Sequence, residues 1–320
     1  MDFLNQLKRL YDALQNCQRV LLIGHQKPDG DALGSTSGFY SWLKREGKKP
    51  TLYCKDLPAQ QYKYLNAFFD YSNDIKVFDE SYDMVLMFDS GDMVYAGVDG
   101  LVPKIPGSPA LVNIDHHTTN QFYGDVNIVD TEATSTCEVV TRFFEANNVM
   151  IDSIMATSLM TGILTDTSHF SNAATTSRGM DVAGRLIASG ARMNEITKYL
   201  LKNKELPILK IWGLALSRLQ KNEEQDIAVT FVTNEDFLKH GVSPNAVEGI
   251  SNFLQGVTGN AESILVLHDR GDGTIKGSMR SVTRDVSAIA KLFGGGGHKL
   301  AAGFAVKGTI RETKEGFEVV

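Results

Sequence analysis

Short apolar runs recur along the first half of the chain. Residues 20–23 and 84–88 are apolar throughout, and Leu111, Val112 and Ile114 form a third run. Runs that are apolar without alternation are typical of strands buried on both faces of a parallel sheet. The pattern therefore predicts three buried strands, and residues 50–54 and 124–129 predict two shorter ones.

Segments with helical spacing of apolar residues lie between these runs. We expect helices near residues 4–14, 34–43, 135–144 and 151–164. Ser135 and Glu138 have the spacing of a capping box at the start of the third helix. Alternating strands and helices predict an α/β fold with a parallel sheet.

The second half of the chain has a different pattern. Gly190 fits the end of a helix, and apolar residues from Ile196 to Leu216 predict connecting helices. Beyond them, residues 227–232 and 264–267 predict strands, and residues 235–240 and 246–254 predict helices. We therefore expect an N-terminal domain over residues 1–190, a helical linker over 191–222 and a smaller α/β domain over 223–320.

Carboxylates and imidazoles follow the predicted strands directly. His25, Asp29 and Asp31 come after the first strand, on a loop before a helix that we expect past Gly34. Asp89 follows residues 84–88, and Asp92 nearby is equally consistent with a turn. The carboxyl ends of parallel strands meet at one edge of a sheet, where ligands bind. The alternative is a set of local turns and helix caps.

Carboxylates and imidazoles also follow two further predicted elements. Asp115, His116 and His117 end the third strand, and Asp166 follows the apolar helix at 151–164. The candidate ligands share oxygen and nitrogen donors without sulfur: His25, Asp29, Asp31, Asp89, His116 and Asp166. Four carboxylates and two imidazoles carry too much negative charge for one divalent ion, so they predict two. Mixed carboxylate and imidazole ligation favours Mn²⁺ over Mg²⁺, and paired ions roughly 3.5–4 Å apart serve phosphoester hydrolysis.

Composition limits the partners. The 320 residues carry a net charge of −6, which argues against long nucleic acid held by many phosphate contacts and permits a small anionic ligand. The three cysteines are scattered, so neither a zinc knuckle nor a disulfide framework is expected. No segment has the length and apolarity of a membrane span, and we expect a cytoplasmic protein. The sequence leaves open whether the chain forms a homodimer.

A local basic region stands out near the C-terminus. It contains Lys276, Arg280, Arg284, Lys291 and Lys299. Arg280 lies in a strand-like segment, where a guanidinium can bind phosphate in a bidentate manner.

A run of four glycines, at 294–297, precedes His298 in the same region. The run indicates either a flexible turn or a backbone that approaches a ligand closely.

These motifs resemble those of the DHH phosphoesterases. The matching segments are His25 to Asp31, Asp89, Asp115-His116-His117 and Thr165-Asp166-Thr167, in order and spacing. The glycine run with His298 resembles the signature of the DHH-associated C-terminal domain, so the resemblance covers nearly the whole chain. It implies that residues 1–190 are the catalytic domain and residues 223–320 the substrate-binding domain.

The resemblance also implies residue roles. His25, Asp29 and Asp89 would bind one metal, and Asp31, Asp89, His116 and Asp166 the other, with Asp89 bridging and His117 facing the substrate phosphate. Asp89, His116 and His117 are thus the expected catalytic residues. The expected substrate contacts lie in the C-terminal domain: Ser278, Arg280, Gly295, Gly296, Gly297 and His298.

The expected substrates are small. The family members of this size degrade nano-RNA or linear dinucleotides exonucleolytically and dephosphorylate 3′-phosphoadenosine 5′-phosphate. An alternative is a manganese-dependent inorganic pyrophosphatase, and a second is a nucleotide-binding module without catalysis. A serine hydrolase built on Ser90 lacks a nucleophile elbow.

Overall fold

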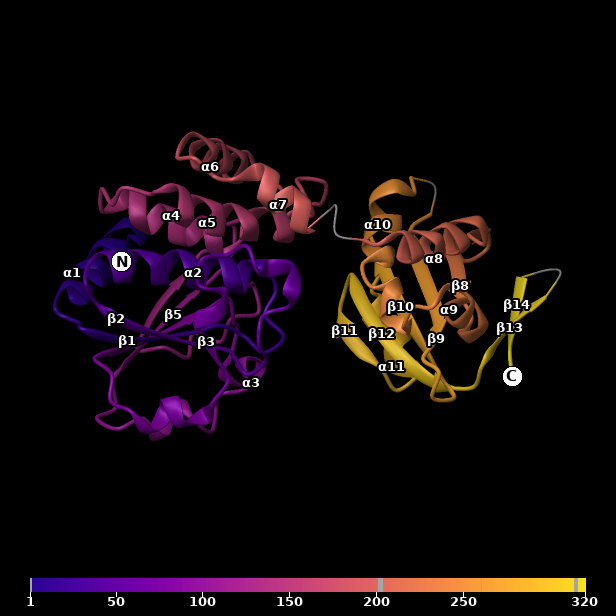
Figure 1. Ribbon diagram of the computed structural model, residues 1–320, viewed down its shortest axis with the longest axis horizontal. Coiled ribbons are helices and arrows are strands. Elements are labelled where there is room, and N and C mark those ends of the chain that lie inside the picture. The colour runs from indigo at the N-terminus through magenta and orange to yellow at the C-terminus, as the bar shows by residue number, and fades with distance from the viewer. Residues whose placement is uncertain (1, 201–203, 260, 314–315) are drawn as a thin grey trace. The chain divides into compact units, whose positions relative to one another are not determined.

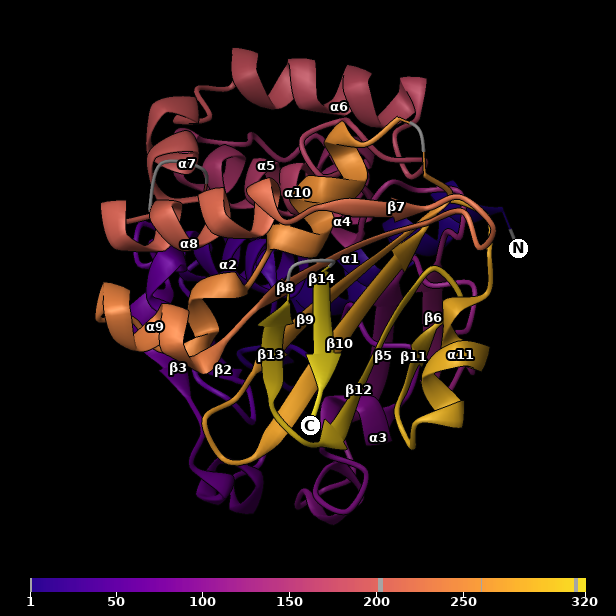
Figure 2. The same cartoon turned by 90° about the vertical axis from the view of Figure 1, so that its right-hand side faces the viewer.

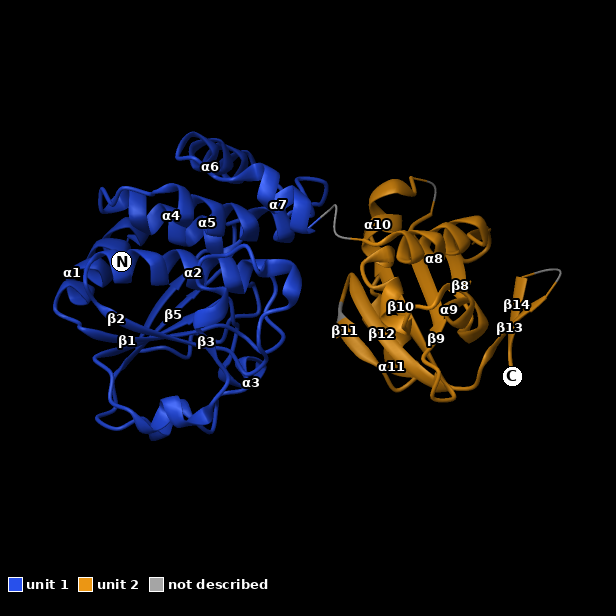
Figure 3. Cartoon of the chain, viewed as in Figure 1, with its two compact units in different colours: residues 1–203 blue, residues 204–320 orange. Residues whose placement is uncertain are grey.

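The computed structural model describes residues 2–200, 204–259, 261–313 and 316–320. The chain forms two compact units, residues 1–203 and residues 204–320 (Figure 3). None of the helices within these described ranges is both long and apolar enough to cross a membrane.

The first unit contains a sheet of six parallel strands. In the order β3-β2-β1-β4-β5-β6, they are β3 (Tyr71–Ser72), β2 (Lys49–Tyr53), β1 (Arg19–Ile23), β4 (Met84–Phe88), β5 (Ala110–Asp115) and β6 (Val126–Val129). The chain adds strands in one direction from β1 and in the other from β4. Strand order therefore reverses between β1 and β4, which is the point where open α/β sheets bind ligands.

Helices cover one face of this sheet (Figure 1). The helices of the unit on this side are α1 (Phe3–Gln15), α2 (Gly30–Arg45), α4 (Thr136–Ala146), α5 (Ser153–Asp166), α6 (Ser177–Ala188) and α7 (Met193–Leu200). Short elements pack on the opposite face: η3 (Ile75–Asp79), α3 (Met93–Ala96) and η4 (Val102–Lys104). Two further 3-10 helices, η1 (Gln60–Tyr62) and η2 (Phe68–Asp70), complete the unit.

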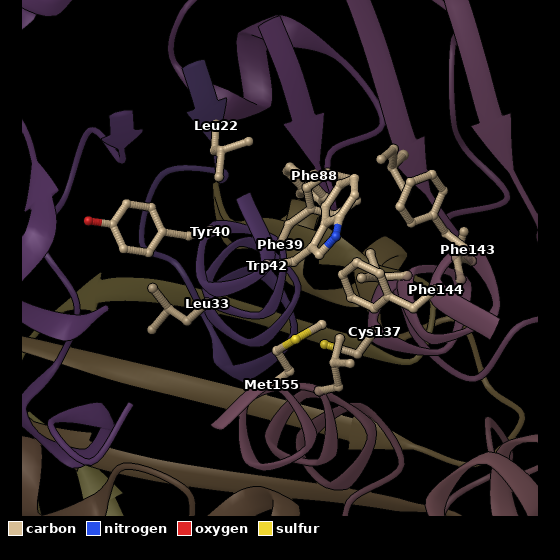
Figure 4. Packing of buried hydrophobic residues seen from close by; sticks show 14 of the residues in the cluster. Leu22, Leu33, Phe39, Tyr40, Trp42, Phe88, Cys137, Phe143, Phe144 and Met155 are labelled. Carbon is tan, nitrogen blue, oxygen red and sulfur yellow. The ribbon is translucent and has the colours of Figure 1, made fainter. Parts of the chain in front are cut away.

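Aromatic side chains fill the core between the sheet and the helices (Figure 4). Phe39 lies 5.2 Å from Trp42 in an edge-to-face pair and 5.3 Å from Phe88, measured between ring centroids. Such pairs add about 0.5–1.5 kcal/mol beyond their buried area. Because Phe88 is the last residue of β4, this packing fixes the position from which Asp89 leaves the sheet.

Helices α2 and α5 approach each other closely at glycines. A Cβ atom on Gly34 would lie 2.4 Å from the Ser158 carbonyl oxygen, and one on Gly162 would lie 2.4 Å from Asp31 Oδ1. Neither position has room for a side chain. The contact brings the start of α2 against α5, whose last residue is Asp166.

The second unit is built on a mixed sheet (Figure 2). In the order β11-β12-β10-β9-β8-β7, its strands are β11 (Gly296–His298), β12 (Ala301–Lys307), β10 (Thr274–Ser281), β9 (Ser263–Asp269), β8 (Ile227–Val232) and β7 (Gln220–Asn222). Only the β8–β9 pair is parallel among these neighbours. The remaining elements are α8 (Leu206–Ser217), α9 (Asn234–His240), η5 (Pro244–Val247), α10 (Ile250–Val257), α11 (Val286–Leu292) and the hairpin β13 (Ile310–Thr313) and β14 (Gly316–Val319).

The predicted α/β class and the parallel first sheet are confirmed, and two local predictions are wrong. Helix α2 starts at Gly30 rather than past Gly34, so Asp31 lies in its first turn. The single helix expected over 246–254 is split into η5 and α10, because Gly249 has a left-handed φ of 85°. The segment predicted as a helical linker, residues 191–222, contains α7 in the first unit and α8 in the second, and residues 201–203 lie outside the described chain.

Candidate functional site

Asp29 and His25 are positioned by the turn between β1 and α2. Asp29 is the N-cap of α2, where its Oδ1 accepts hydrogen bonds from the Asp31 and Ala32 amides at 2.9 and 3.1 Å. His25 Nδ1 lies 2.7 Å from the Gln26 carbonyl oxygen, and its Nε2 lies 3.7 Å from Asp29 Oδ1. The backbone contact at Nδ1 holds the ring so that Nε2 faces the carboxylates.

Asp89 connects two groups of residues. Its φ of 57° is left-handed, which is uncommon for a residue other than glycine and turns the chain sharply after β4. Its Oδ2 lies 3.5 Å from His25 Nε2, and its Oδ1 lies 3.7 Å from His116 Nε2. The Thr136 hydroxyl donates to Oδ1 at 3.0 Å. The two oxygens of Asp89 therefore face two different imidazoles.

Asp31 is completely buried at the N-terminus of α4. It accepts hydrogen bonds from the backbone amides of Thr136 at 2.6 Å and Cys137 at 2.9 Å. The free amides and positive dipole end of a helix stabilise a carboxylate in this place. Helix α4 thus fixes Asp31, which lies more than 100 residues away in sequence.

His116 faces three carboxylates. Its Nδ1 lies 3.3 Å from the Ala133 carbonyl oxygen. Its Nε2 lies 3.1 Å from Asp166 Oδ2 and 3.8 Å from Asp31 Oδ2, yet this buried atom makes no hydrogen bond within the described residues. A buried nitrogen that faces oxygens without a hydrogen bond is well placed to ligate a cation that lies between them.

His117 is held differently from His116. Its Nδ1 lies 2.8 Å from Asp115 Oδ1, and the Asn120 amide donates to Asp115 Oδ2 at 2.6 Å. Asp115 is fully buried, so this pair fixes the His117 ring and leaves Nε2 free. The side chain of His117 is 38% exposed, which makes Nε2 available to a ligand.

The carboxylates and imidazoles perturb one another strongly. Burial opposes protonation of His25, but Asp29 and Asp89 outweigh it and raise the pKa of the imidazole to about 12. Burial likewise opposes protonation of His116, but Asp166 and Asp31 raise its pKa to about 11. Burial, and then the neighbouring Asp89, raise the pKa of Asp166 to about 6. A divalent cation bound among these groups favours their deprotonated forms and displaces their protons.

The donor atoms form three groups in which all atoms lie within 4.8 Å of one another. The groups are His25, Asp29 and Asp89; Asp31, His116 and Asp166; and Asp89, His116 and His117. The third group uses a nitrogen of His117 that already contacts Asp115. Over the described chain, no lysine or arginine forms an ion pair with these aspartates. Oxygen and imidazole donors without a cationic side chain fit divalent metal ions.

Three residues that hold the donors in place through hydrogen bonds were missed in the sequence: Asn120, Thr136 and Cys137. Asp115 was part of the predicted motif without an assigned role, and it supports His117 in the same way. The capping box beside them is only half formed. Ser135 accepts from the Glu138 amide as predicted, but the Glu138 carboxylate accepts from the amide and hydroxyl of Thr134, and pairs with Arg178.

Ser278 and Arg280, two of the predicted substrate contacts, share one face of β10. Ser278 and Arg280 both line a cavity of about 160 Å³. Arg280 Nε donates to Asn252 Oδ1 at 2.6 Å, and its Nη1 donates to the Met279 carbonyl oxygen at 2.8 Å. The guanidinium is therefore oriented by α10 and the strand.

The four glycines have different surroundings. Gly294, with φ of 72°, ends α11 in a Schellman arrangement, in which its amide donates to Lys291 O and the Gly295 amide to Ala290 O. A Cβ atom on Gly295 would lie 2.2 Å from the Gly303 carbonyl oxygen, whereas one on Gly296 meets no atom within 4 Å.

The run is also part of the sheet. Gly296, Gly297 and His298 form β11 and pair with β12, so the second half of the run is a strand, while Gly294 lies in the turn that follows α11. The side chain of His298 lies outside the described part of the structure.

The parallel sheet and the aspartate and histidine cluster at its switch point are those of a metal-dependent phosphoesterase. The chain belongs to the DHH family: residues 19–163 match the DHH family, N-terminal domain, and residues 224–317 match the DHHA1 domain.

Curated relatives cover most of the chain. It is 31% identical over 291 residues to the bifunctional oligoribonuclease and PAP phosphatase NrnA of Thermus thermophilus, covering 90% of this chain and 84% of that protein. It is 25% identical over 290 residues to NrnA of Bacillus subtilis, covering 90% and 89%. An exopolyphosphatase-related protein from Bacteroides fragilis has the same fold, with a TM-score of 0.86 at 22% identity, covering 95% of this chain and 92% of that chain.

Proposed function

We propose that this protein is a metal-dependent phosphohydrolase that releases nucleoside monophosphates from short oligoribonucleotides and removes a phosphate from 3′-phosphoadenosine 5′-phosphate. The similarity to NrnA proteins over 90% of the chain supports the substrate class. The observation that carries the chemistry is the cluster of aspartate and histidine donors at the switch point of the sheet.

Two divalent ions, with Mn²⁺ favoured, are assigned to two of the donor groups. His25, Asp29 and Asp89 would hold one ion, and Asp31, His116 and Asp166 together with Asp89 would hold the other. The two Asp89 oxygens face different imidazoles, which supports the assignment of Asp89 to both groups. Bound divalent ions supply Lewis acidity, which lowers the pKa of a water and neutralises charge on phosphoryl oxygens.

The protein residues position the substrate and the donors. Burial opposes protonation of His117, but Asp115 outweighs it and raises the pKa of the imidazole. The protonated ring, directed by Asp115 through Nδ1, donates a hydrogen bond from Nε2 to a phosphoryl oxygen. Thr136 and the N-terminus of α4 hold Asp89 and Asp31 in place through hydrogen bonds. Such fixed donors reduce the reorganisation that the reaction needs.

The second unit is assigned to nucleotide binding. Arg280 contacts a phosphate and Ser278 lies beside it on the same strand, while the backbone of Gly295, Gly296 and Gly297 approaches the nucleotide and His298 provides a further contact. The predicted domain roles, catalysis over residues 1–190 and substrate binding over 223–320, follow from this assignment.

Four substrates measured side by side test the proposal. Release of nucleoside monophosphate and phosphate is followed with Mn²⁺ or with chelator, using phosphoadenosine phosphate, a linear diadenylate, a five-nucleotide RNA and pyrophosphate. We expect metal-dependent turnover of the first three. Turnover of pyrophosphate alone would favour the pyrophosphatase alternative, and no turnover of any substrate would favour a binding module.

Replacement of Asp89 tests the metal assignment. Asp89→Ala removes both oxygens that face His25 and His116, so we expect kcat/KM to fall by more than the roughly 10–100-fold typical of an outer-shell partner. Bound metal per chain should also decrease. Asp92→Ala is the matched control, because Asp92 caps α3 and contacts none of the donors. Metal content and kinetics of Asp89→Ala that equal those of the unmodified protein would refute the assignment.

A further inference from the structure

A second cavity adjoins the one beside Arg280 in the C-terminal unit. It has a volume of about 710 Å³ and is lined in part by Arg270, Asp272 and Gly296. Four residues line both cavities: Pro244, Asn245, His268 and Lys276. The two cavities therefore form a continuous surface, and this inference rests on the proposed action on short oligonucleotides.

The side chain of His268 lies at the junction of the two cavities. It is 6% exposed on β9, and its Nδ1 is covered and lacks a partner in the described chain. Burial, then Lys276 and Arg270, lower the pKa of the imidazole to about 4, so the ring is neutral and has both a donor and an acceptor nitrogen. Phe237 packs against the ring, with centroids 6.3 Å apart. A ring that lines two cavities and has a buried nitrogen without a partner in the described chain indicates a ligand contact.

Lys276 provides positive charge next to this ring. It lies directly across from His268 in the antiparallel β9–β10 pair, and it forms no ion pair within the described residues. Arg270 lies 3.9 Å from Asp272, whose carboxylate also accepts hydrogen bonds from the Thr274 amide and hydroxyl. The smaller cavity is also lined by a carboxylate, that of Glu248. Among the described residues that line both cavities, Lys276 is therefore the cation without an ion pair, which favours an anionic ligand.

Arg280, Ser278 and Lys276 alternate along β10 and so lie on one face. At about 3.3 Å per residue, the Cα atoms of Arg280 and Lys276 are about 13 Å apart. A ligand that engages both cations is therefore longer than one phosphate group. A Cβ atom on Gly296 would meet no atom of the described residues within 4 Å.

We propose that Lys276 and His268 form a second nucleotide subsite, in which Lys276 pairs with a phosphodiester further along the oligonucleotide than the phosphate at Arg280, and His268 hydrogen-bonds the adjoining base. The subsite contributes to the binding of oligonucleotides and is not used by 3′-phosphoadenosine 5′-phosphate. The ligand class is a short single-stranded RNA.

Binding of a fluorescent five-nucleotide RNA to the full chain tests the subsite independently of turnover. Fluorescence anisotropy is measured in chelator, over a range of salt concentrations. Lys276→Ala should weaken binding roughly 3–10-fold, as expected for one exposed charged contact. It should also reduce the slope of log K against log salt by about 0.7, the value for one phosphate contact on a single strand.

Lys307→Ala is the matched control, because Lys307 is an exposed lysine on β12 that lines neither cavity. It should leave both the affinity and the salt slope unchanged. The inhibition constant of 3′-phosphoadenosine 5′-phosphate, measured by competition with the RNA, should be the same for the unmodified protein and for Lys276→Ala. An unchanged salt slope for Lys276→Ala, or no RNA binding by the unmodified protein, would overturn the subsite even where phosphoadenosine phosphate is hydrolysed.

His268→Phe separates binding from folding. Phenylalanine keeps a ring against Phe237 and removes the unpartnered nitrogen, so the melting temperature should be equal or higher. Binding of the five-nucleotide RNA should nevertheless weaken severalfold. Equal RNA affinity for His268→Phe would contradict the assigned role of His268, and a lower melting temperature with proportionate loss of binding would indicate a structural role instead.

Discussion

At the scale of single residues, several side chains both shape the fold and form the site. Asp29 caps α2 with the same oxygen that lies 3.7 Å from His25 Nε2. The helix-cap and ligand interpretations of the sequence are therefore compatible, since one carboxylate has enough lone pairs for both. Asp115 has a supporting role only, because it contacts His117 and Asn120 and does not face the other donors.

Thr136 provides a test at this scale. Its hydroxyl donates to Asp89 Oδ1 at 3.0 Å, while its backbone amide donates to Asp31. Thr136→Val removes only the hydroxyl, so we expect metal affinity or kcat to fall about 10–100-fold, as for other outer-shell partners. Thr136→Ser keeps the hydroxyl and should retain most of the activity. Metal titration by calorimetry measures the effect, and equal affinities for the valine and serine variants would contradict it.

At the scale of elements, the contact of α2 with α5 brings Asp31 and Asp166 toward the same site. Gly162 lies at this contact, where a Cβ atom would be 2.3 Å from Cys137 Sγ and 2.4 Å from Asp31 Oδ1. No local pattern in the sequence identifies Gly162 as essential, because its requirement comes from residues on α2 and α4.

Gly162→Ala should therefore disturb both packing and the site. We expect a loss of about 1–3 kcal/mol in the free energy of unfolding from overpacking, together with weaker metal binding as Asp31 is displaced. Gly184→Ala is the control, because Gly184 is exposed on α6 and a Cβ atom there would meet no other atom within 4 Å. It should stabilise the protein by about 0.5–1 kcal/mol. Chemical denaturation and metal titration measure both variants.

Helix α9 has a pH-dependent anchor. Arg218 contacts both carboxylate oxygens of Asp236, at 2.5 and 3.2 Å, and the Thr233 amide donates to Oδ2 at 2.9 Å. Burial opposes ionisation of Asp236, but Arg218 and Thr233 outweigh it and lower the pKa of the carboxyl. A lowered pKa contributes stability above the unfolded value of about 3.9, and this contribution is lost as pH falls through the folded value.

Asp236→Asn should consequently lower the free energy of unfolding by about 1–3 kcal/mol at pH 7. The difference from the unmodified protein should shrink as pH falls below about 4. Urea denaturation between pH 7 and pH 2 measures the difference, and a gap that stays constant over this range would show that the carboxylate charge is not responsible.

At the scale of the whole molecule, each unit has its own hydrophobic core. Residues 1–203 contain the cores on both faces of the parallel sheet, and residues 204–320 contain three smaller clusters of their own. The aspartate and histidine donors all belong to the first unit, and Arg280 and both cavities belong to the second.

Separate expression of the two units tests this division. We expect residues 204–320 to unfold cooperatively on their own, and Mn²⁺ to stabilise only residues 1–203. At a metal concentration of 100 times the dissociation constant, the free energy of unfolding of residues 1–203 should increase by about 2.7 kcal/mol. Thermal unfolding with and without metal measures this effect. Stabilisation of the C-terminal fragment by Mn²⁺, and none of the N-terminal fragment, would contradict the assignment.

Apolar runs and the residues that follow them are local features, so the amino-acid sequence was enough to predict the α/β class, the strands 84–88 and 227–232 at their observed bounds, and the candidate donors at the strand ends. Three other features became visible only in the folded chain. Asp31 lies in the first turn of α2 and accepts hydrogen bonds from backbone amides of α4. Gly162 must lack a side chain, and His268 lies opposite Lys276 on the neighbouring strand. These features depend on contacts between residues on different elements, and the spacing of apolar residues along the chain does not predict such contacts.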